Sequence, residues 1–267
     1  PRLRAGAEDT TRWMPKTRTP VQEGGSHMEK KTVRAGIVGA GFAARFHYEA
    51  ITKVYGTHVD VKGVYALDTA QAKAFAEERG IRCYDSLESL IGDVDVVHCC
   101  VIVAAHEEIA VAALERDRYV IVEKPLTGYL GDGTEAFHGD RFPKEEALRY
   151  GLASVDRMLA AEGKSKGRIL YAENWVYAPA IQREREVIEK TGAQILWIHG
   201  EEAHSGSHNP TYAYWKYSGG GVLIGKGCHP LTAALYLKRV EGRARERRGG
   251  GHPRPSRPRC FSRRACR

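Results

Sequence analysis

The sequence lacks several features that would place it in a specialised class of protein. No apolar run approaches the ~20 residues of a membrane-spanning helix, and the start of the chain has no continuous apolar stretch of the secretory kind. The six cysteines include no C-x-x-C pair, so neither a disulfide scaffold nor a zinc site of that type is indicated. With an ordinary 28% of charged residues, these absences predict a globular protein of a reducing, cytoplasmic setting, without a membrane partner.

Charge is unevenly distributed along the chain. The formal net charge of +8 is a balance found in nucleic-acid-binding proteins. The last 25 residues hold ten arginines and one acid, and residues 1–28 carry a further net +2, which leaves 29–242 mildly acidic at −3. The excess positive charge therefore lies in the two end segments, and nucleic acid is not the expected partner of the body.

The end segments also differ from the body in composition. Residues 242–267 are mostly Arg, Gly, Pro and Ala with no Leu, Ile or Val, which predicts a disordered basic tail. Two interpretations are open. A genuine basic tail would bind phosphate backbones without sequence preference. Alternatively, the change in composition at residue 242 marks a shifted reading frame in GC-rich DNA. We favour the second interpretation, because a helical pattern stops abruptly at this point. Residues 1–28 are expected to be a disordered leader or tag, since Gly-Ser-His-Met at 25–28 resembles a tag remnant.

Between these ends, short β-rich runs alternate with amphipathic helical stretches. This alternation predicts right-handed crossovers and a parallel sheet covered on both faces, a doubly wound Rossmann-type α/β domain over 29–172. A partial α/β second domain is expected over 173–241, with helices at 178–190 and 227–238 and a strand at 194–202.

The junction of the first strand and the first helix carries a G-x-G-x-x-A pattern. Gly39 permits a tight turn, Gly41 lets the backbone approach a pyrophosphate, and Ala44 lets the helix pack close to the strand. The helix start, which includes Phe42 and Ala43, supplies free N–H groups and partial positive charge for phosphates. The pattern also fits a plain strand-to-helix turn, but its position between a strand and a helix favours dinucleotide binding.

Asp68, at the end of the second predicted strand, completes this dinucleotide-binding pattern. Its carboxylate is placed to accept hydrogen bonds from an adenosine ribose. It would repel a 2′-phosphate, and Thr69 offers no cation, so NAD is favoured over NADP as the cofactor. An exposed carboxylate without such a role is the alternative.

Glu123, Lys124 and Pro125 follow the fifth predicted strand. Ligands bind outside the carboxyl ends of strands in open α/β sheets, where a lysine can hold and polarise a substrate hydroxyl or carbonyl. Taken alone, a surface lysine before a proline is more often solvated.

Together, several of these strings resemble the Gfo/Idh/MocA family of NAD(P)-dependent oxidoreductases, over roughly residues 31 to 240. The strings are 35–43, Asp68, 94–97, His106 and 123–125. The resemblance implies a Rossmann domain followed by an α/β domain with a large open sheet. It also implies hydride exchange between a nicotinamide and a sugar or cyclitol carbon. It places His106, Glu123 and Lys124 at the cofactor, with Lys124 also a catalytic residue at the reacting oxygen of the substrate.

The second domain matches the family only in part. Residues 219–229 resemble the family's G-G-G-x-L-x-D-x-G-x-H segment, and His229 falls on its catalytic, substrate-contacting histidine, a plausible general acid/base. A structural histidine is the alternative. Gly225 and Thr232 stand where relatives have aspartates that would orient or charge-balance His229, and Lys226 sits beside the first of these positions.

Two other polar clusters are less distinctive. Asn174, Trp175 and Tyr177 follow a strand end where relatives line the substrate cleft, and we expect hydrogen bonds to hydroxyls and an aromatic wall for a sugar ring, with loop packing as an equal alternative. The second cluster has no metal-binding spacing, so no metal site is predicted; it comprises His199, Glu201, Glu202, His204 and His208.

Relatives continue well beyond the point at which the family pattern stops here, near Val240. Missing strands would leave an open edge, which predicts a weakly active or inactive oxidoreductase and puts the family's homo-oligomer in doubt. The leading hypothesis is an oxidoreductase with a sugar or polyol substrate. The alternatives are a non-catalytic NAD-binding or sensing protein and nucleic-acid binding through the tail.

Overall fold

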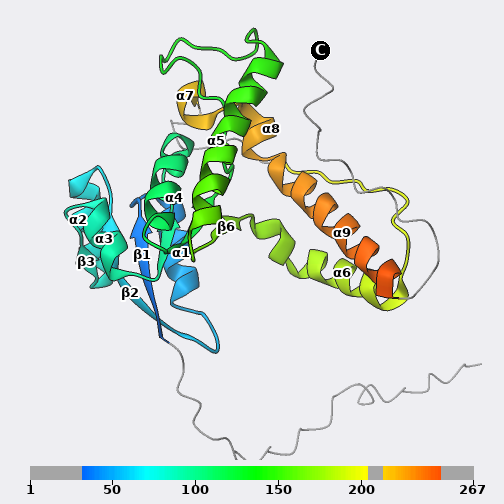
Figure 1. Cartoon of the computed structure of the whole chain (residues 1–267), viewed down its shortest axis with the longest axis horizontal. Helices are drawn as coiled ribbons and strands as arrows, with labels where there is room; N and C mark the ends of the chain where they lie inside the picture. The colour runs from blue at the N-terminus through cyan, green and yellow to red at the C-terminus, as the bar shows by residue number, and fades with distance from the viewer. Residues whose placement is uncertain (1–31, 204–212, 248–267) are drawn as a thin grey trace, which may run out of the picture.

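A six-stranded, fully parallel sheet organises the computed structural model, which describes residues 32–203 and 213–247 (Figure 1). The strand order is β3-β2-β1-β4-β5-β6. The strand bounds are β1 Thr32–Val38, β2 His58–Tyr65, β3 Arg82–Cys83, β4 Val96–Cys99, β5 Tyr119–Glu123 and β6 Ile169–Ala172. This is the order of a doubly wound dinucleotide-binding sheet, whose ligands lie where the order reverses, between β1 and β4.

Helices cover both faces of the sheet, as the sequence predicted. They are α1 Phe42–Ile51, α2 Thr69–Arg79, α3 Leu87–Asp93, α4 His106–Leu114 and α5 Lys144–Lys164. Successive side chains of a strand point to opposite faces, so Ile37 packs in the core under α1 and α2, while Val38 packs in the core under α3, α4 and α5. The predicted doubly wound α/β architecture is confirmed.

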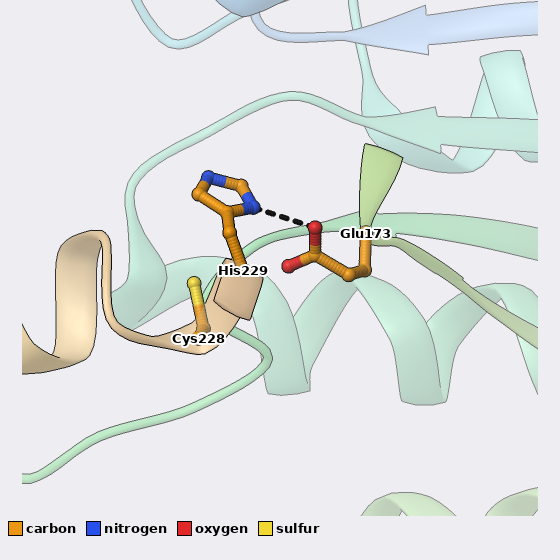
Figure 2. A group of neighbouring side chains, drawn as sticks. All are labelled: Glu173, Cys228 and His229. Atoms are coloured by element: carbon orange, nitrogen blue, oxygen red, sulfur yellow. Dashed lines mark hydrogen bonds and ion pairs between the residues drawn. The ribbon is translucent and has the colours of Figure 1, made fainter. Parts of the chain in front are cut away.

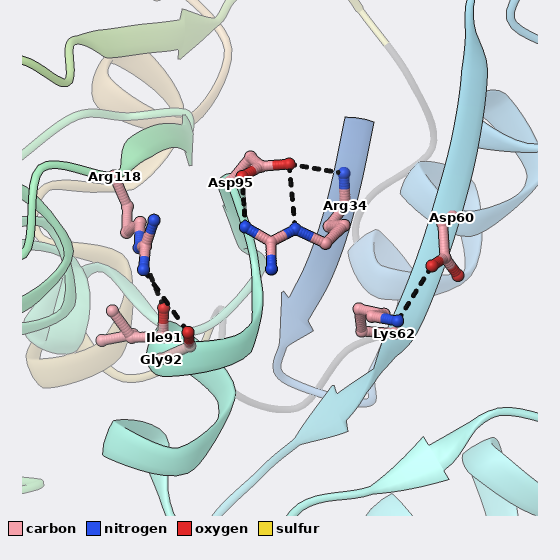
Figure 3. Close-up of polar contacts among 7 residues, drawn as sticks. All are labelled: Arg34, Asp60, Lys62, Ile91, Gly92, Asp95 and Arg118. Atoms are coloured by element: carbon pink, nitrogen blue, oxygen red, sulfur yellow. Dashed lines mark hydrogen bonds and ion pairs between the residues drawn. The ribbon is translucent and has the colours of Figure 1, made fainter. Parts of the chain in front are cut away.

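Two arginines tie the sheet together at the end away from the glycine turn (Figure 3). Arg34 of β1 donates through Nη2 to Asp95 Oδ1 at 2.6 Å and through its backbone N–H to Asp95 Oδ2 at 2.9 Å. Arg118 donates to the carbonyls of Ile91 and Gly92, at the end of α3. The Arg34 guanidinium lowers the pKa of the Asp95 carboxyl, although burial opposes this.

Beyond β6, all regular secondary structure in the described chain is helical. It contains the 3-10 helix η3 Asn174–Tyr177, then α6 Pro179–Thr191, α7 Trp215–Ser218, α8 Gly221–Gly225 and α9 Cys228–Arg247. Figure 1 shows α6 and α9 side by side, directed away from the sheet, and Ile188, Leu237 and Val240 form the core between them.

The prediction of a strand at 194–202 is wrong. Residues 192–203 carry no strand, and Leu196 and Trp197 are 88% and 78% exposed. A strand needs a neighbour for its N–H and C=O groups, and an alternating pattern cannot supply one. The part of 173–241 that the structure describes therefore holds no strand, so the α/β character expected of that segment is not found there.

The ends of the chain are only partly covered by the structure. Helix α9 continues to Arg247, past the position 242 at which the sequence predicted the ordered chain to end. The expectations for 1–28 and for 248–267 lie outside the described residues. Within the described ranges, no helix has both the length and the apolar character needed to cross a membrane.

Candidate active site

The turn after β1 requires glycine at its first position. Gly39 has a φ of +102°, and its N–H donates to Tyr65 O at 2.7 Å. A Cβ atom at Gly39 would lie 2.4 Å from the carbonyl oxygen of Cys100, just beyond β4. The close approach of these two neighbouring strand ends therefore excludes any side chain here.

Gly41 lies two residues further on and faces open space. A Cβ atom there would meet no atom within 4 Å, and no side chain caps the start of α1. Ala44 is fully buried against the sheet, Ala43 is partly buried and Phe42 is 76% exposed. An uncapped helix start beside an open backbone has the geometry that a pyrophosphate needs.

Asp68 lies at the N-cap of α2, after the strand that pairs with β1. It is exposed, and its Oδ1 accepts a hydrogen bond of 3.0 Å from the N–H of Gln71. The structure thus gives Asp68 a capping role that the sequence analysis missed, although aspartate before a helix is a recognisable capping signal.

His106 is buried behind the site. Its Nδ1 lies 3.2 Å from Pro125 O and 3.3 Å from Leu126 O, and its Nε2 lies 3.2 Å from Val101 O. Burial lowers the pKa of His106, against the effect of these carbonyls. The ring joins the end of β4 to the loop after β5, so it supports the loop that carries Lys124.

Glu123, the last residue of β5, lies at the end of a partly buried chain of polar side chains. Its Oε1 lies 2.9 Å from His47 Nε2, and its Oε2 accepts the N–H of Lys124 at 3.0 Å. Burial disfavours the charged carboxylate, but His47 and Lys124 outweigh it, so the pKa of Glu123 is lowered. His47 Nδ1 in turn lies 2.9 Å from Nδ1 of His98, whose pKa burial lowers to about 3. No motif in the sequence points to these two histidines.

Lys124 reaches across to the helices beyond the sheet. Its Nζ donates to Gly225 O at 2.8 Å, and nearby Trp215 Nε1 donates to Tyr129 O at 2.7 Å. The loop after β5 is therefore tied to α7 and α8, and Lys124 is held beside the segment that leads into His229.

His229, near the start of α9, is paired with a carboxylate that the sequence analysis did not assign to it. Figure 2 shows its imidazole and the Glu173 carboxyl group turned toward each other, with Nδ1 2.5 Å from Oε1. Glu173 directly follows β6 and is 2% exposed, while His229 is 6% exposed. Gly225 and Thr232 stand where relatives have aspartates near this histidine. In this chain the carboxylate beside His229 comes instead from Glu173, which follows β6.

The three predicted cleft residues of η3 lie in different surroundings. The Trp175 ring stacks on the His229 imidazole, with centroids 5.8 Å apart and planes inclined by 11°. Asn174 and Tyr177 are exposed, Tyr177 by 74%. The structure thus brings Trp175 to His229 and leaves the other two at the surface.

Among the described residues, one group has metal-ligand chemistry. The ligand atoms of Glu173, Cys228 and His229 all lie within 4.8 Å of one another. Burial and the nearby Glu173 raise the pKa of the Cys228 thiol, which disfavours the thiolate that binds metals.

The polar cluster around 199–208 is not assembled into a site in the described part. His199 and Glu201 are exposed and 3.8 Å apart, and His204 and His208 lie outside the described residues. Glu202 Oε2 lies 3.9 Å from His229 Nε2.

The Rossmann segment of the chain is similar to known proteins. Residues 33–139 match the Gfo/Idh/MocA family, described as an oxidoreductase family with an NAD-binding Rossmann fold. A Saccharomyces cerevisiae protein of uncharacterized function is 24% identical over 77% of this chain and 55% of its own length. The inositol 2-dehydrogenase/D-chiro-inositol 3-dehydrogenase of Lactiplantibacillus plantarum is 33% identical over 37% of this chain and 29% of its own. The chain thus spans about half the length of the yeast relative, and less of the bacterial one.

Solved structures share the fold. GenD2 from gentamicin A biosynthesis, in complex with NAD, has a TM-score of 0.60 at 24% identity, covering 83% of this chain and 57% of GenD2. A probable dehydrogenase from Thermotoga maritima has a TM-score of 0.58 at 19% identity, covering 77% of this chain and 55% of its own. Residues 33–139 are therefore similar to the NAD-binding Rossmann domain of the Gfo/Idh/MocA oxidoreductase family, and the parallel sheet described above has this fold.

Proposed function

We propose that the chain is an NAD-dependent oxidoreductase acting on a CH–OH carbon of a sugar or cyclitol. In this proposal residues 29–172 hold the cofactor, and 173–241 contribute to the substrate site. The family match of the Rossmann segment and the relatives named as inositol dehydrogenases support this substrate class.

The residues at the carboxyl ends of β1 and β2 fit a dinucleotide. Gly41 and the uncapped start of α1 would hold the pyrophosphate, flanked by Phe42 and Ala43, and Asp68 would accept hydrogen bonds from the adenosine ribose. The carboxylate of Asp68 favours NAD over NADP. NAD, when bound, supplies the acceptor for the substrate's hydride.

Lys124 and His229 would handle the substrate's oxygen and its proton. The Lys124 ammonium would donate to the reacting oxygen and stabilise negative charge as its proton leaves. His229 would accept that proton as a general base. Trp175 would provide an apolar wall, and Asn174 and Tyr177 would contact outer hydroxyls.

One observation carries this proposal: Lys124 and Glu173, which follow the neighbouring strands β5 and β6, each bind a residue of the 225–229 segment. Lys124 follows β5 and bonds Gly225 O, and His229, four residues further along the chain, bonds Glu173 after β6. The carboxyl ends of parallel strands are where such sheets bind ligands.

NAD binding by calorimetry and NADH formation with a panel of inositols and sugars test the proposal. Lys124→Met should abolish turnover but leave measurable NAD binding, because the variant loses one cofactor contact and keeps the glycine turn and Asp68. The proposed oxidoreductase function would be overturned if the full chain bound no NAD, or if K124M turned over substrate at the wild-type rate.

A non-catalytic NAD-binding or sensing protein is the second candidate. Gly225 and Thr232, in place of family aspartates, favour it. Tight NAD binding without turnover of any substrate in the panel would support it over the oxidoreductase.

A further inference from the structure

We propose that Glu173 is the positioning residue that fixes the proton pattern and orientation of His229. The inference rests on the proposed function, in which His229 accepts a substrate proton. It assigns to this chain a carboxylate–histidine pair built from two segments 56 residues apart.

The hydrogen bonds at Glu173 set the direction of the contact. Oε1 lies 2.5 Å from His229 Nδ1 and also accepts the N–H of Trp175 at 3.0 Å. An ionised carboxylate only accepts hydrogen bonds, so Nδ1–H of the imidazole is the donor. The neutral ring then carries its lone pair on Nε2, which is the form a general base requires.

The surroundings hold the imidazole in one orientation. Trp175 stacks on one face of the ring, and the backbone N–H of His229 donates to Lys226 O at 3.0 Å. Glu202 Oε2 lies 3.9 Å from Nε2, beyond hydrogen-bond distance, whereas Glu173 Oε1 is within hydrogen-bond distance of Nδ1. Glu173 is thus the carboxylate that decides which ring nitrogen carries the proton.

The second oxygen of Glu173 indicates that this carboxylate also binds a ligand, in addition to its contact with His229. Oε2 is buried and has no hydrogen-bond partner in the described part of the chain. An unpaired buried oxygen is costly unless a bound molecule donates to it, and a polyol hydroxyl is such a donor. Both oxygens of one carboxylate would then serve the site, one on His229 and one toward the substrate.

Nitrogen-15 NMR of the histidines tests the contact directly, with the His229 signals assigned from His229→Asn. The wild-type ring should show the Nδ1–H tautomer, and Glu173→Gln, which keeps shape but removes charge, should give a mixed or Nε2–H pattern. Glu201→Gln, an exposed neighbour on the same segment as Glu202, is the matched control and should leave the pattern unchanged. Glu173→Asp, with a shorter carboxylate, provides a second variant should E173Q fold poorly.

Kinetics test the consequence on any substrate that the wild-type chain turns over. E173Q should lower kcat by ~10²-fold or more at unchanged KM for NAD, E173D should recover part of the loss, and E201Q should match wild type. A kcat change in E173Q no larger than in E201Q would overturn the positioning role.

The two readouts separate the two proposals. Absence of turnover in the wild type overturns the proposed oxidoreductase, while the NMR pattern still decides whether Glu173 sets the His229 tautomer. The inference is overturned if His229 has the same pattern in wild type and E173Q. It is equally overturned if added Co²⁺ gives a thiolate absorption band that both Cys228→Ser and His229→Asn abolish, because His229 would then be a metal ligand.

Discussion

Gly39 and Gly41 belong to one turn but meet different physical demands, which a pair of alanine variants separates. At Gly39 a methyl group would adopt a φ of +102° and overlap Cys100 O, so G39A should destabilise the fold by ~2 kcal/mol or more. At Gly41 the backbone is extended, with φ −85° and ψ −158°, and a Cβ meets nothing within 4 Å. G41A should therefore unfold in urea at nearly the wild-type midpoint while NAD binding weakens at least about tenfold. Equal losses of stability in both variants would contradict this division.

Asp68 combines a helix cap with the proposed ribose contact, and two substitutions distinguish these roles. Asparagine is as good an N-cap as aspartate, whereas alanine loses ~1 kcal/mol of cap energy. D68N should keep the melting temperature of the wild type but lower the ratio of NAD to NADP affinity, because the charge that repels a 2′-phosphate is gone. D68A should lower both. The measurements are thermal unfolding and calorimetric titration with each cofactor, and an unchanged ratio in D68N would remove Asp68 from the cofactor site.

At the scale of elements, the Arg34–Asp95 pair fixes β1 against the start of β4, and its contribution depends on pH. The Asp95 pKa is lowered in the folded chain, chiefly by its hydrogen bond to Arg34, from an unfolded value near ~3.9. A lowered carboxyl pKa stabilises the fold above the unfolded pKa, and this stability is lost as pH falls through the folded pKa.

D95N should therefore be less stable than wild type at pH 7, and the gap should narrow once the pH drops below about 4. The difference will be small, because both side chains are 40% exposed and solvent screens the pair. Urea unfolding at several pH values measures it. A gap that stays constant down to pH 2 would show that Asp95 acts through shape and not through charge.

Elements with local signals were predictable from sequence, and contacts between distant elements were not. The bounds of helix α2 follow from local signals, because Asp68 caps its start and Gly80, at φ +62°, ends it. The strand expected at 194–202 failed because its pattern says nothing about a pairing partner. The glycine turn and Lys124 could be found as motifs. The Glu173–His229 pair could not, because the fold alone brings together residues that far apart in the chain.

At the scale of the whole molecule, the net charge of +8 does not describe the surface that holds the candidate site. Residues 248–267 contain seven arginines and no acid, so their removal would leave a net charge of +1. Every residue proposed to hold NAD lies between Gly39 and Lys124, in a sheet covered on both faces by its own helices.

Deleting 248–267 should therefore leave NAD affinity unchanged. Any DNA binding that the full chain shows at low salt should be lost in the shortened chain. Non-specific binding to phosphates scales with the cations available to displace counterions, and this segment holds seven arginines and no acid. Calorimetry with NAD and a salt series of DNA-binding measurements, on the full and shortened chains, make the comparison. DNA binding that survives the deletion would place the polyanion site within residues 1–247, and a fall in NAD affinity would connect residues 248–267 with the cofactor site.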